Sequence, residues 1–391
     1  MKALKLRRFM YLRRKPIATL TLVLVSVSML STATATILHG FYRCCTAYLG
    51  EGDDIIALYD RGSSTPFTGL IPSRIADELT SIDGVLAFSM EVLAPSILEG
   101  EPVIVRGVHL EDLLKLNDIE ILDGSKPSSD EPAYALIGCR AASRLKVKPG
   151  ARLIALGVLS DRYVELRVEA VYSSDTALDD EVIASMDTGR WLRGVGYDYA
   201  TLIRVRIDRA KLTLDTLTRE LSSRVGIEGG PGGGGPPRPT LKYSYIATAS
   251  GSIGVSTVEG FMERYLESYG LTGWSITLLS ISTILFASLT IVEAFRMVVE
   301  RHGAELSILR SLGLSRLDLK IDMILKLTPY IMLSSLIGSA SALALVEALR
   351  SYGLLRILSY TVSVGFDPAT LTVSIASTML LAIISIAWRD M

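Results

Sequence analysis

The chain has 391 residues and a formal net charge of −1, because 40 Lys and Arg nearly balance 41 Asp and Glu. A nucleic-acid partner is not expected, since such a surface needs clustered basic residues. Three cysteines, Cys44, Cys45 and Cys139, are too few and too irregularly spaced for a disulfide framework or a zinc site. One bridge from Cys139 to the adjacent pair and free buried thiols both remain open. Glutamine is absent and Asn117 is the only asparagine, a depletion typical of a thermophile.

Hydrophobicity is concentrated in four uncharged runs, each close to the roughly 20 residues that a helix needs to span the hydrocarbon layer. These runs are Ile17–Leu38, Trp274–Val292, Leu327–Val346 and Ala369–Ala387. They predict four transmembrane helices. For the first run, a cleaved signal peptide is the alternative, because Ala33-Thr34-Ala35 resembles a cleavage site. A retained anchor is favoured, since the run continues to about spanning length.

The distribution of charge predicts the topology. Residues 1–15 hold seven basic and no acidic residues, so the positive-inside rule places the N-terminus in the cytoplasm. Four crossings then put residues 40–272 and 347–368 outside, and residues 293–326 and the C-terminus inside. The inner loop holds six basic residues and the second outer loop only two, which agrees. The apolar runs contain no Asp, Glu, Lys, Arg or His, which argues against an ion-coupled carrier or a channel.

The long segment between the first two runs shows both strand and helix patterns. Alternating apolar and polar residues, or short apolar runs, predict strands. The strands are expected at Leu202–Asp208, Val164–Glu169, Val103–Val108, Ala133–Ile137 and Arg152–Leu156. Apolar residues at helical spacing predict helices around Ile75 to Ile82 and Leu214 to Leu221. We therefore expect a mixed α+β domain here.

Two further segments follow this domain. Residues 226–239 read GIEGGPGGGGPPRP, which predicts a linker because neither a helix nor a strand accommodates this composition. After it, Val258, Phe261, Met262, Tyr265 and Tyr269 share one helical face, with glutamates on the other. This helix is expected either to act as a stalk that transmits motion or to lie against its own domain.

No catalytic or nucleotide-binding pattern is present in the sequence. The three histidines, His39, His109 and His302, are too scattered to indicate a metal cluster. Neither the linker glycines nor Gly124-Ser125-Lys126 fits a phosphate-binding loop. A nucleophile-elbow glycine pattern is also missing. We expect a chain that is not an enzyme and binds no cofactor or metal of its own.

The inner loop holds the most specific pattern. Leu306, Leu309 and Leu312 recur every third residue, and Ile308 and Leu312 lie four apart. One flank of a short helix is therefore apolar, while Glu305 and Arg310 stay polar. Gly313 supplies the helix stop. Such a helix can lie on the membrane, rest on the chain's own helices, or enter a partner's groove.

Residues 305–315, ELSILRSLGLS, resemble the inner loop of the FtsX/MacB/LolC family of ABC-transporter permeases, which reads close to E-R-x-x-E-I-x-I-L-R-A-L-G-x-S. The chain departs from this pattern in the five-residue spacing of Glu300 and Glu305, and in having Leu306 for Ile and Ser311 for Ala. The layout of crossings and outer domain is also similar to the family. Three short segments resemble its periplasmic core pattern, namely residues 82–85, 105–108 and 142–150.

The resemblance implies a membrane protein with four transmembrane α-helices and a large mixed α+β extracytoplasmic domain inserted between helices 1 and 2. It implies a permease subunit of an ABC transporter in the plasma membrane, among its lipids. A separate cytoplasmic ABC ATPase would hold ATP and Mg, and a second permease copy or homologue would complete a dimer. Such a permease transmits movement from the ATPase to its outer domain. A membrane-anchored receptor or assembly factor without an ATPase is the rival interpretation.

The resemblance also implies that the inner-loop helix contacts the ATPase. The contacting residues would be Glu305, Leu306, Leu309, Arg310, Leu312 and Gly313. In the third apolar run, Ser334, Gly338 and Ala342 recur every fourth residue, a spacing that allows another helix to approach closely. That helix could belong to the same chain or to a second copy.

The predicted organisation follows the chain in ten segments. They are a basic cytoplasmic N-terminus (1–16), helix 1 (17–39), the extracytoplasmic core domain (40–225), the Gly/Pro linker (226–240), the stalk (241–272), helix 2 (273–292), the coupling loop (293–326), helix 3 (327–349), an outer loop (350–368) and helix 4 (369–388).

Overall fold

The structure, a computed structural model, describes residues 14–46, 54–63, 69–127, 133–225, 253–268, 272–357, 359–361 and 368–387. Two compact units are present. The helical unit comprises Met1–Tyr42, Gly273–Leu355 and Val362–Met391, and the α/β unit comprises Arg43–Thr272 and Arg356–Thr361. The predicted Gly/Pro linker, residues 226–240, lies outside the described residues.

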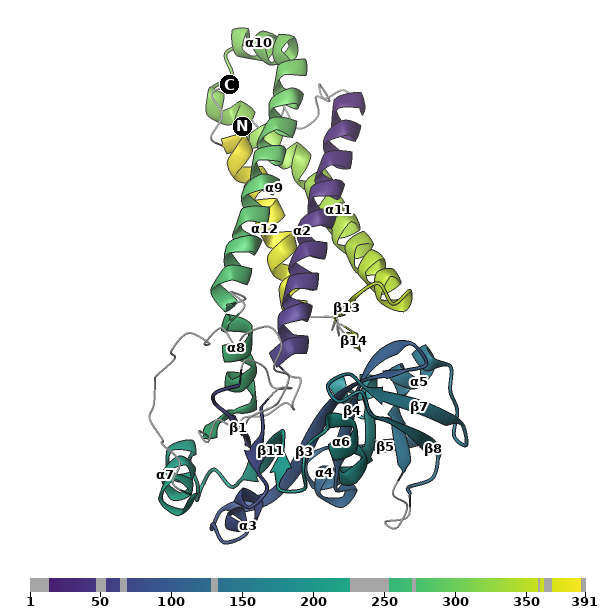
Figure 1. Cartoon of the computed structure of the whole chain (residues 1–391). Coiled ribbons are helices and arrows are strands. Elements are labelled where there is room, and N and C mark those ends of the chain that lie inside the picture. The colour runs from purple at the N-terminus through teal and green to yellow at the C-terminus, as the bar shows by residue number, and fades with distance from the viewer. Residues whose placement is uncertain are drawn as a thin grey trace. The chain divides into compact units, whose positions relative to one another are not determined.

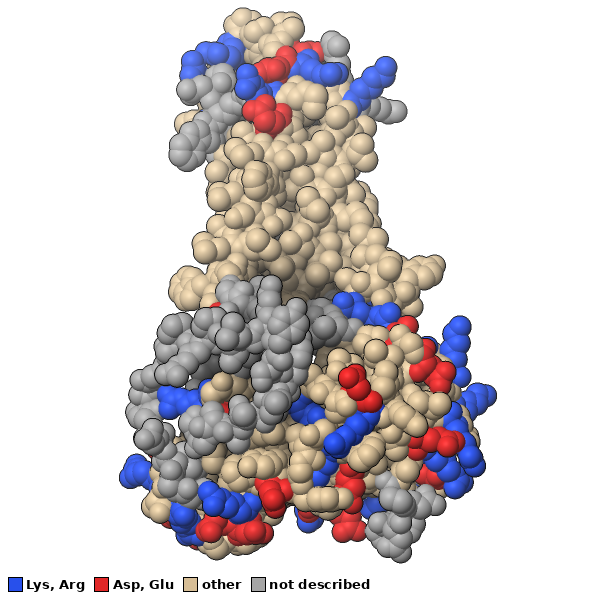
Figure 2. Space-filling view, in the orientation of Figure 1, with Lys and Arg blue, Asp and Glu red and all other residues tan. Residues whose placement is uncertain are grey.

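The helical unit contains five described helices (Figure 1). They are α2 (Arg14–Thr46), α9 (Gly273–Arg301), α10 (Gly303–Ser311), α11 (Arg316–Ser351) and α12 (Pro368–Ala387). Helices α2, α9 and α11 are long and apolar enough to cross a membrane, whereas α12 contributes a shorter apolar stretch, Ile375–Ser385. The space-filling view agrees, because this unit's visible face is free of charge along most of its length (Figure 2).

The helices extend beyond the apolar runs from which they were predicted. Helix α9 continues to Arg301, and α11 begins at Arg316, well before the apolar run at Leu327. Both extensions belong to the predicted coupling loop, so helix occupies most of it. The boundary of an apolar run marks where polarity changes, and helical hydrogen bonding continues past that point.

An apolar core joins four of these helices. Leu20 and Leu24 of α2 pack with Phe295 of α9, Leu327 of α11 and Ala382 of α12. All five side chains are buried. Because dispersion contacts and close packing, rather than expulsion of water, hold helices together in lipid, this shared core defines the unit.

The α/β unit is built on a ten-stranded sheet in the order β12-β1-β11-β3-β4-β9-β6-β8-β5, with β7 pairing β3 and β8. Its strands are β1 (Ile55–Asp60), β3 (Val85–Leu98), β4 (Glu101–Val108), β5 (Glu120–Gly124), β6 (Tyr134–Gly138), β7 (Arg152–Gly157), β8 (Tyr163–Ser173), β9 (Val182–Ser185), β11 (Leu202–Ile207) and β12 (Ile253–Thr257). Two small pairs accompany it, β2 (Ile71–Pro72) with β10 (Tyr199–Ala200), and the hairpin β13 (Arg356–Ile357) with β14 (Tyr360–Thr361).

Short helices cover the sheet. They are α3 (Ile75–Leu79), α4 (Leu110–Leu116), α5 (Cys139–Leu145), η2 (Ala177–Asp180), α6 (Met186–Arg193), α7 (Leu214–Val225) and α8 (Val258–Ser268). Of the apolar clusters that result, one large cluster lies among β1, β11, α3 and α7, and another among β4, β6 to β9 and α5. The long strand β3 joins the two halves, because it pairs with β11, β4 and β7.

All five predicted strands are confirmed as β11, β8, β4, β6 and β7, and both predicted helices as α3 and α7. The alternation within β11 is typical of a half-buried strand, yet nearly all of its residues are buried. Its polar position Arg204 is as inaccessible as its apolar neighbours Ile203 and Val205. The buried carboxylate of Glu91 pairs with this guanidinium and so allows it to be buried there.

Helix α8, the predicted stalk, is amphipathic where its side chains are described. Phe261 and Met262 are buried, and Glu263 and Glu267 are exposed. The Phe261 ring lies 4.1 Å from the ring of Tyr59 on β1, measured between centroids. Helix α8 therefore packs on its own sheet, through the strand next to β12.

Candidate functional site

Helix α10 is anchored to its neighbours by two buried side chains. His302, immediately before the helix, is buried, and its Nδ1 lies 2.7 Å from the carbonyl oxygen of Val298 on α9. Leu306 packs in a small cluster with Leu319 of α11. At the other end, Gly313 has φ +88°, a left-handed conformation that ends the helix and that side chains other than glycine rarely adopt. The helix is thus firmly attached to α9 and α11.

The structure divides the predicted apolar flank of α10. Leu306 is only 6% exposed and Leu309 is partly buried in the same internal cluster, whereas Leu312 is 75% exposed. Arg310 and Gly313 are exposed, and Glu305 is half buried. Ile308, which was not among the expected ATPase contacts, is 60% exposed. The large exposed apolar side chains here are therefore Ile308 on α10 and Leu312 at its C-cap, and Leu306 anchors the helix.

The predicted small-residue stripe packs within the chain. Ser334, Gly338 and Ala342 are all buried on α11. A Cβ atom at Gly338 would lie 2.6 Å from the carbonyl oxygen of Val25 on α2, so the two backbones approach too closely for a side chain. Beside it, the hydroxyl of Ser28 donates to the carbonyl of Ser335 at 3.1 Å. This arrangement is the same-chain alternative of the prediction.

The α/β unit contains a buried ionic cluster that the sequence analysis did not anticipate. Arg106 on β4 forms ion pairs with Glu91 on β3 and with Glu181, where its Nε lies 2.6 Å from a carboxylate oxygen. Arg204 on β11 donates to the second oxygen of Glu91 at 2.6 Å and to Asn117 at 2.7 Å. The side chains of all four charged residues are at most 1% exposed.

The ion pairs of the cluster oppose the effect of burial on its charged groups. Burial alone would raise the pKa of Glu91, but Arg204 and Arg106 outweigh it and hold that pKa below its ordinary value. Burial lowers the pKa of Arg204, and the carboxylate of Glu91 opposes that shift. Removal of one member would leave a buried charge without its partner.

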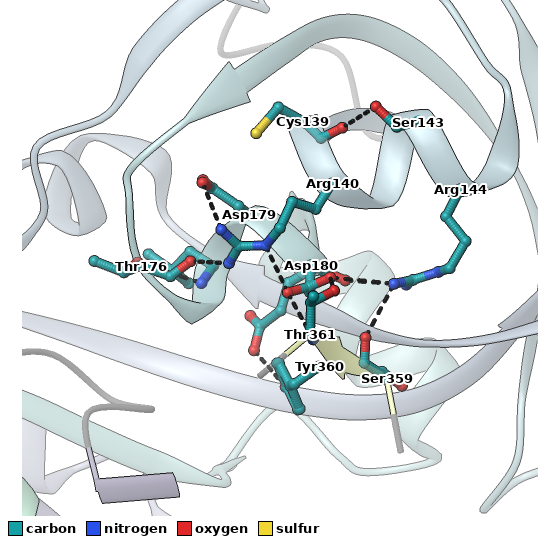
Figure 3. Close-up of polar contacts among 12 residues, drawn as sticks. Cys139, Arg140, Ser143, Arg144, Thr176, Asp179, Asp180, Ser359, Tyr360 and Thr361 are labelled. Atoms are coloured by element: carbon teal, nitrogen blue, oxygen red, sulfur yellow. Dashed lines mark hydrogen bonds and ion pairs between the residues drawn. The ribbon is translucent and has the colours of Figure 1, made fainter. Parts of the chain in front are cut away.

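A second polar cluster lies beside the first and receives the β13–β14 hairpin (Figure 3). Arg140 on α5 pairs with Asp179 at 3.2 Å and Asp180 at 2.8 Å, and Arg144 pairs with Asp180 at 3.1 Å. Both aspartates are buried. Burial by itself lowers the pKa of Arg140, yet Asp180 and Asp179 raise it above its ordinary value. We call Arg140, Arg144 and residues 179–181 the socket.

Three hydrogen bonds hold the hairpin's second strand in the socket. The hydroxyl of Tyr360 donates to Glu181 at 2.6 Å, and the backbone N–H and hydroxyl of Thr361 donate to the two oxygens of Asp180 at 3.1 and 2.9 Å. Arg144 also donates to the carbonyl of Ser359 at 3.0 Å. At the first strand, Arg356 lies 3.3 Å from Glu101.

The remaining candidate side chains lie apart from these clusters. His39 and His109 are exposed, and His302 is buried on the helical unit. Cys139 carries a free thiol, and burial raises its pKa. Within the part of the chain that the structure describes, no group of three or more His, Cys, Asp or Glu side chains could hold a metal ion.

Comparison with known proteins found likenesses at the level of structure. Neither a protein-family model nor a curated protein matches the chain. The extracellular domain of the noncanonic ABC-type transporter YknZ from Gram-positive bacteria is 14% identical, and the match covers 44% of this chain and 95% of that one with a TM-score of 0.34. The periplasmic region of MacB from Actinobacillus actinomycetemcomitans is 10% identical, with 55% and 94% covered and a TM-score of 0.35. At these values, neither likeness assigns an activity to this chain.

Proposed function

We propose that the chain is the membrane subunit of an ABC transporter, with four crossings, an extracytoplasmic α/β unit and a separate cytoplasmic ATPase as partner. The exposed apolar surface of α10 carries this proposal. Ile308 on α10 and Leu312 at its C-cap are exposed between two helices of membrane-spanning length along the chain, and Leu306 anchors α10 against α11. Burying one such side chain in a partner's groove contributes about 1.5–3 kcal/mol.

The anchoring of α10 supports a role in transmission. Movement of α10 would be passed to α9 through His302 and to α11 through the contact between Leu306 and Leu319. Helix α9 follows strand β12 and helix α8 along the chain, and α11 leads into the β13–β14 hairpin. Both helices are therefore joined covalently to the α/β unit. ATP-driven closure of a partner dimer would reach that unit along these helices.

The test uses a matched pair of variants on α10. Leu312→Asp places a charge on the exposed apolar surface, and Ser307→Asp places the same charge on an exposed polar position of the same helix. The first should weaken ATPase binding by about 2–4 kcal/mol, the range of an interface hot spot, and the second should leave binding intact. Affinity purification of the full chain from native membranes, with the partner identified by its nucleotide-binding sequence motifs, measures the outcome. Equal retention in both variants, or the absence of an ABC ATPase, would contradict the proposal.

A topology measurement provides an independent check. In a chain whose native cysteines are replaced by serine, Ser223→Cys on the α/β unit should react with a membrane-impermeant maleimide in intact cells. Ser307→Cys on α10 should react only after the membrane is opened. Both serines are exposed in the structure, so burial does not account for a difference. Labelling in the reverse order would contradict the proposed orientation.

A further inference from the structure

The β13–β14 hairpin has an unusual place in the chain. It lies in sequence between α11 and α12 of the helical unit, yet Arg356–Thr361 belongs to the α/β unit. The chain consequently crosses between the units four times, at residues 42/43, 272/273, 355/356 and 361/362. The last two passages between the units exist only because residues 356–361 belong to the α/β unit.

The attachment is polar, specific and buried. Ser359 is 4% exposed and Tyr360 is buried with it. Glu181, which accepts from Tyr360, and Asp180, which accepts from Thr361, are both inaccessible. A hydrogen bond from Tyr360 or Thr361 to an ionised, buried carboxylate is of the stronger, charge-assisted kind. The socket arginines already neutralise Asp180. The hairpin therefore adds donors to the socket without adding a charge.

The socket continues into the buried ionic cluster. From Tyr360, the contacts run through Glu181 to Arg106, then to Glu91 and finally to Arg204 on β11. Strand β11 pairs with β1, the first strand after helix α2. One uninterrupted set of hydrogen bonds and ion pairs thus connects the segment between α11 and α12 with the strand that follows α2.

We propose that the hairpin is a tether, which fixes the α11–α12 connection to the socket and gives the α/β unit a mechanical attachment separate from the β1 and β12 ends. Displacement of α11 or α12 is then delivered directly to Asp180 and Glu181, and through Arg106 to the middle of the sheet. The tether stands on the contacts of the hairpin alone. It holds whether or not an ATPase is the partner.

Cysteine accessibility tests the tether in the full chain, with the native cysteines replaced by serine. Ser359→Cys keeps the backbone carbonyl that accepts from Arg144, and its thiol is buried while the hairpin is docked. It should react with a maleimide at least about tenfold more slowly than the exposed Ser223→Cys, as expected when local opening controls access. Combined Tyr360→Phe and Thr361→Val should accelerate this labelling at least about tenfold. The control Tyr163→Phe, on an exposed tyrosine of the same unit, should not.

Hydrogen exchange separates release of the tether from unfolding. In the double variant Tyr360→Phe and Thr361→Val, amides of β6 should keep their protection. Amides at and just after the end of α11, residues 347–353, should exchange faster because the hairpin no longer anchors them. If the double variant also exposes β6, Thr361→Val alone is measured by the same criteria. The proposal is overturned if Ser359→Cys reacts as fast as Ser223→Cys while Tyr360, Thr361 and the socket residues are all unchanged. It is equally overturned if the hairpin variants change neither its labelling nor exchange at the end of α11.

Discussion

Replacement of Arg106 by methionine tests the importance of the buried ionic cluster. Arg106 is inaccessible and pairs with two carboxylates, so Arg106→Met leaves Glu181 without its arginine and Glu91 with Arg204 alone. Breaking a buried ion pair by removing one partner costs about 3–5 kcal/mol, because the other charge stays buried. For a unit of this size, each 1 kcal/mol lowers the melting temperature by about 2–4 °C. The expected decrease is therefore roughly 6–20 °C.

The control is the same substitution at the surface. Arg152 is 74% exposed and lies 3.3 Å from Glu165 on the neighbouring strand, an ion pair that solvent screens. Arg152→Met should change the free energy of unfolding by about 1 kcal/mol or less. Thermal unfolding of both full-length variants, with hydrogen exchange of the β3 and β4 amides to localise the effect, gives the comparison. Equal melting temperatures for the two variants would refute the reasoning.

The same comparison has a predicted pH dependence. The pKa of Glu91 is held below its ordinary value of 4.5 by its arginines, so the stabilisation from this ionised group is complete above that value. It is lost as the pH falls through the lowered pKa of the folded state. The difference in melting temperature between the parent and Arg106→Met should therefore be largest near neutral pH and should decrease on acidification. A difference that increases below pH 4.5 would contradict this assignment.

Three further predictions concern other positions. Gly338→Ala should destabilise the packing of α2 and α11 by about 1–3 kcal/mol, because its Cβ would lie 2.6 Å from the carbonyl oxygen of Val25. The control Gly303→Ala has open space around it and should not destabilise the chain; melting temperatures in detergent compare the two variants. Arg193→Met should raise the melting temperature at pH 7, because burial lowers the pKa of Arg193 to about 10 and its Nε and Nη2 have no partner among the described residues; a lower melting temperature would disprove this. Cys139 should react slowly with maleimides near neutral pH, because burial raises its thiol pKa; labelling as fast as that of a free surface cysteine would contradict this.

Much of the framework could be predicted because it depends on local periodicity. Alternation within β11 and β8 and helical spacing within α3 and α7 identified those elements, and three long apolar runs correspond to α2, α9 and α11. The predicted helix stop at Gly313 is also confirmed by its left-handed backbone. In each case the signal and the structure that it indicates lie within the same short segment.

The ionic cluster could not be predicted in the same way, because its partners are distant in sequence. Arg204 lies 113 residues from Glu91, and Tyr360 lies 179 residues from Glu181. The sequence does contain a signal. Glu91 and Arg106 each stand within a predominantly apolar strand. A charge in such a place is stable only with a buried partner, but the sequence does not say which residue supplies it.

The division of the α10 surface shows a second limit. Spacing alone placed Leu306, Leu309 and Leu312 on one flank, and it could not tell which of them the chain itself would cover. The turn at Gly313 and the return of α11 bring Leu319 against Leu306, while Leu312 stays exposed. Contacts between α10 and α11 decide this, so it depends on the tertiary structure.

Transmission between the ATPase and the α/β unit is the central claim, and hydrogen exchange of the complete complex in lipid nanodiscs tests it most directly. Exchange is compared with and without a nucleotide-trapped state of the ATPase. The account predicts altered exchange in the α/β unit, at β12, α8 and the hairpin, and loss of that response in Leu312→Asp but not in Ser307→Asp. An ATPase that binds and hydrolyses ATP in the complex while exchange throughout the α/β unit stays unchanged would contradict it.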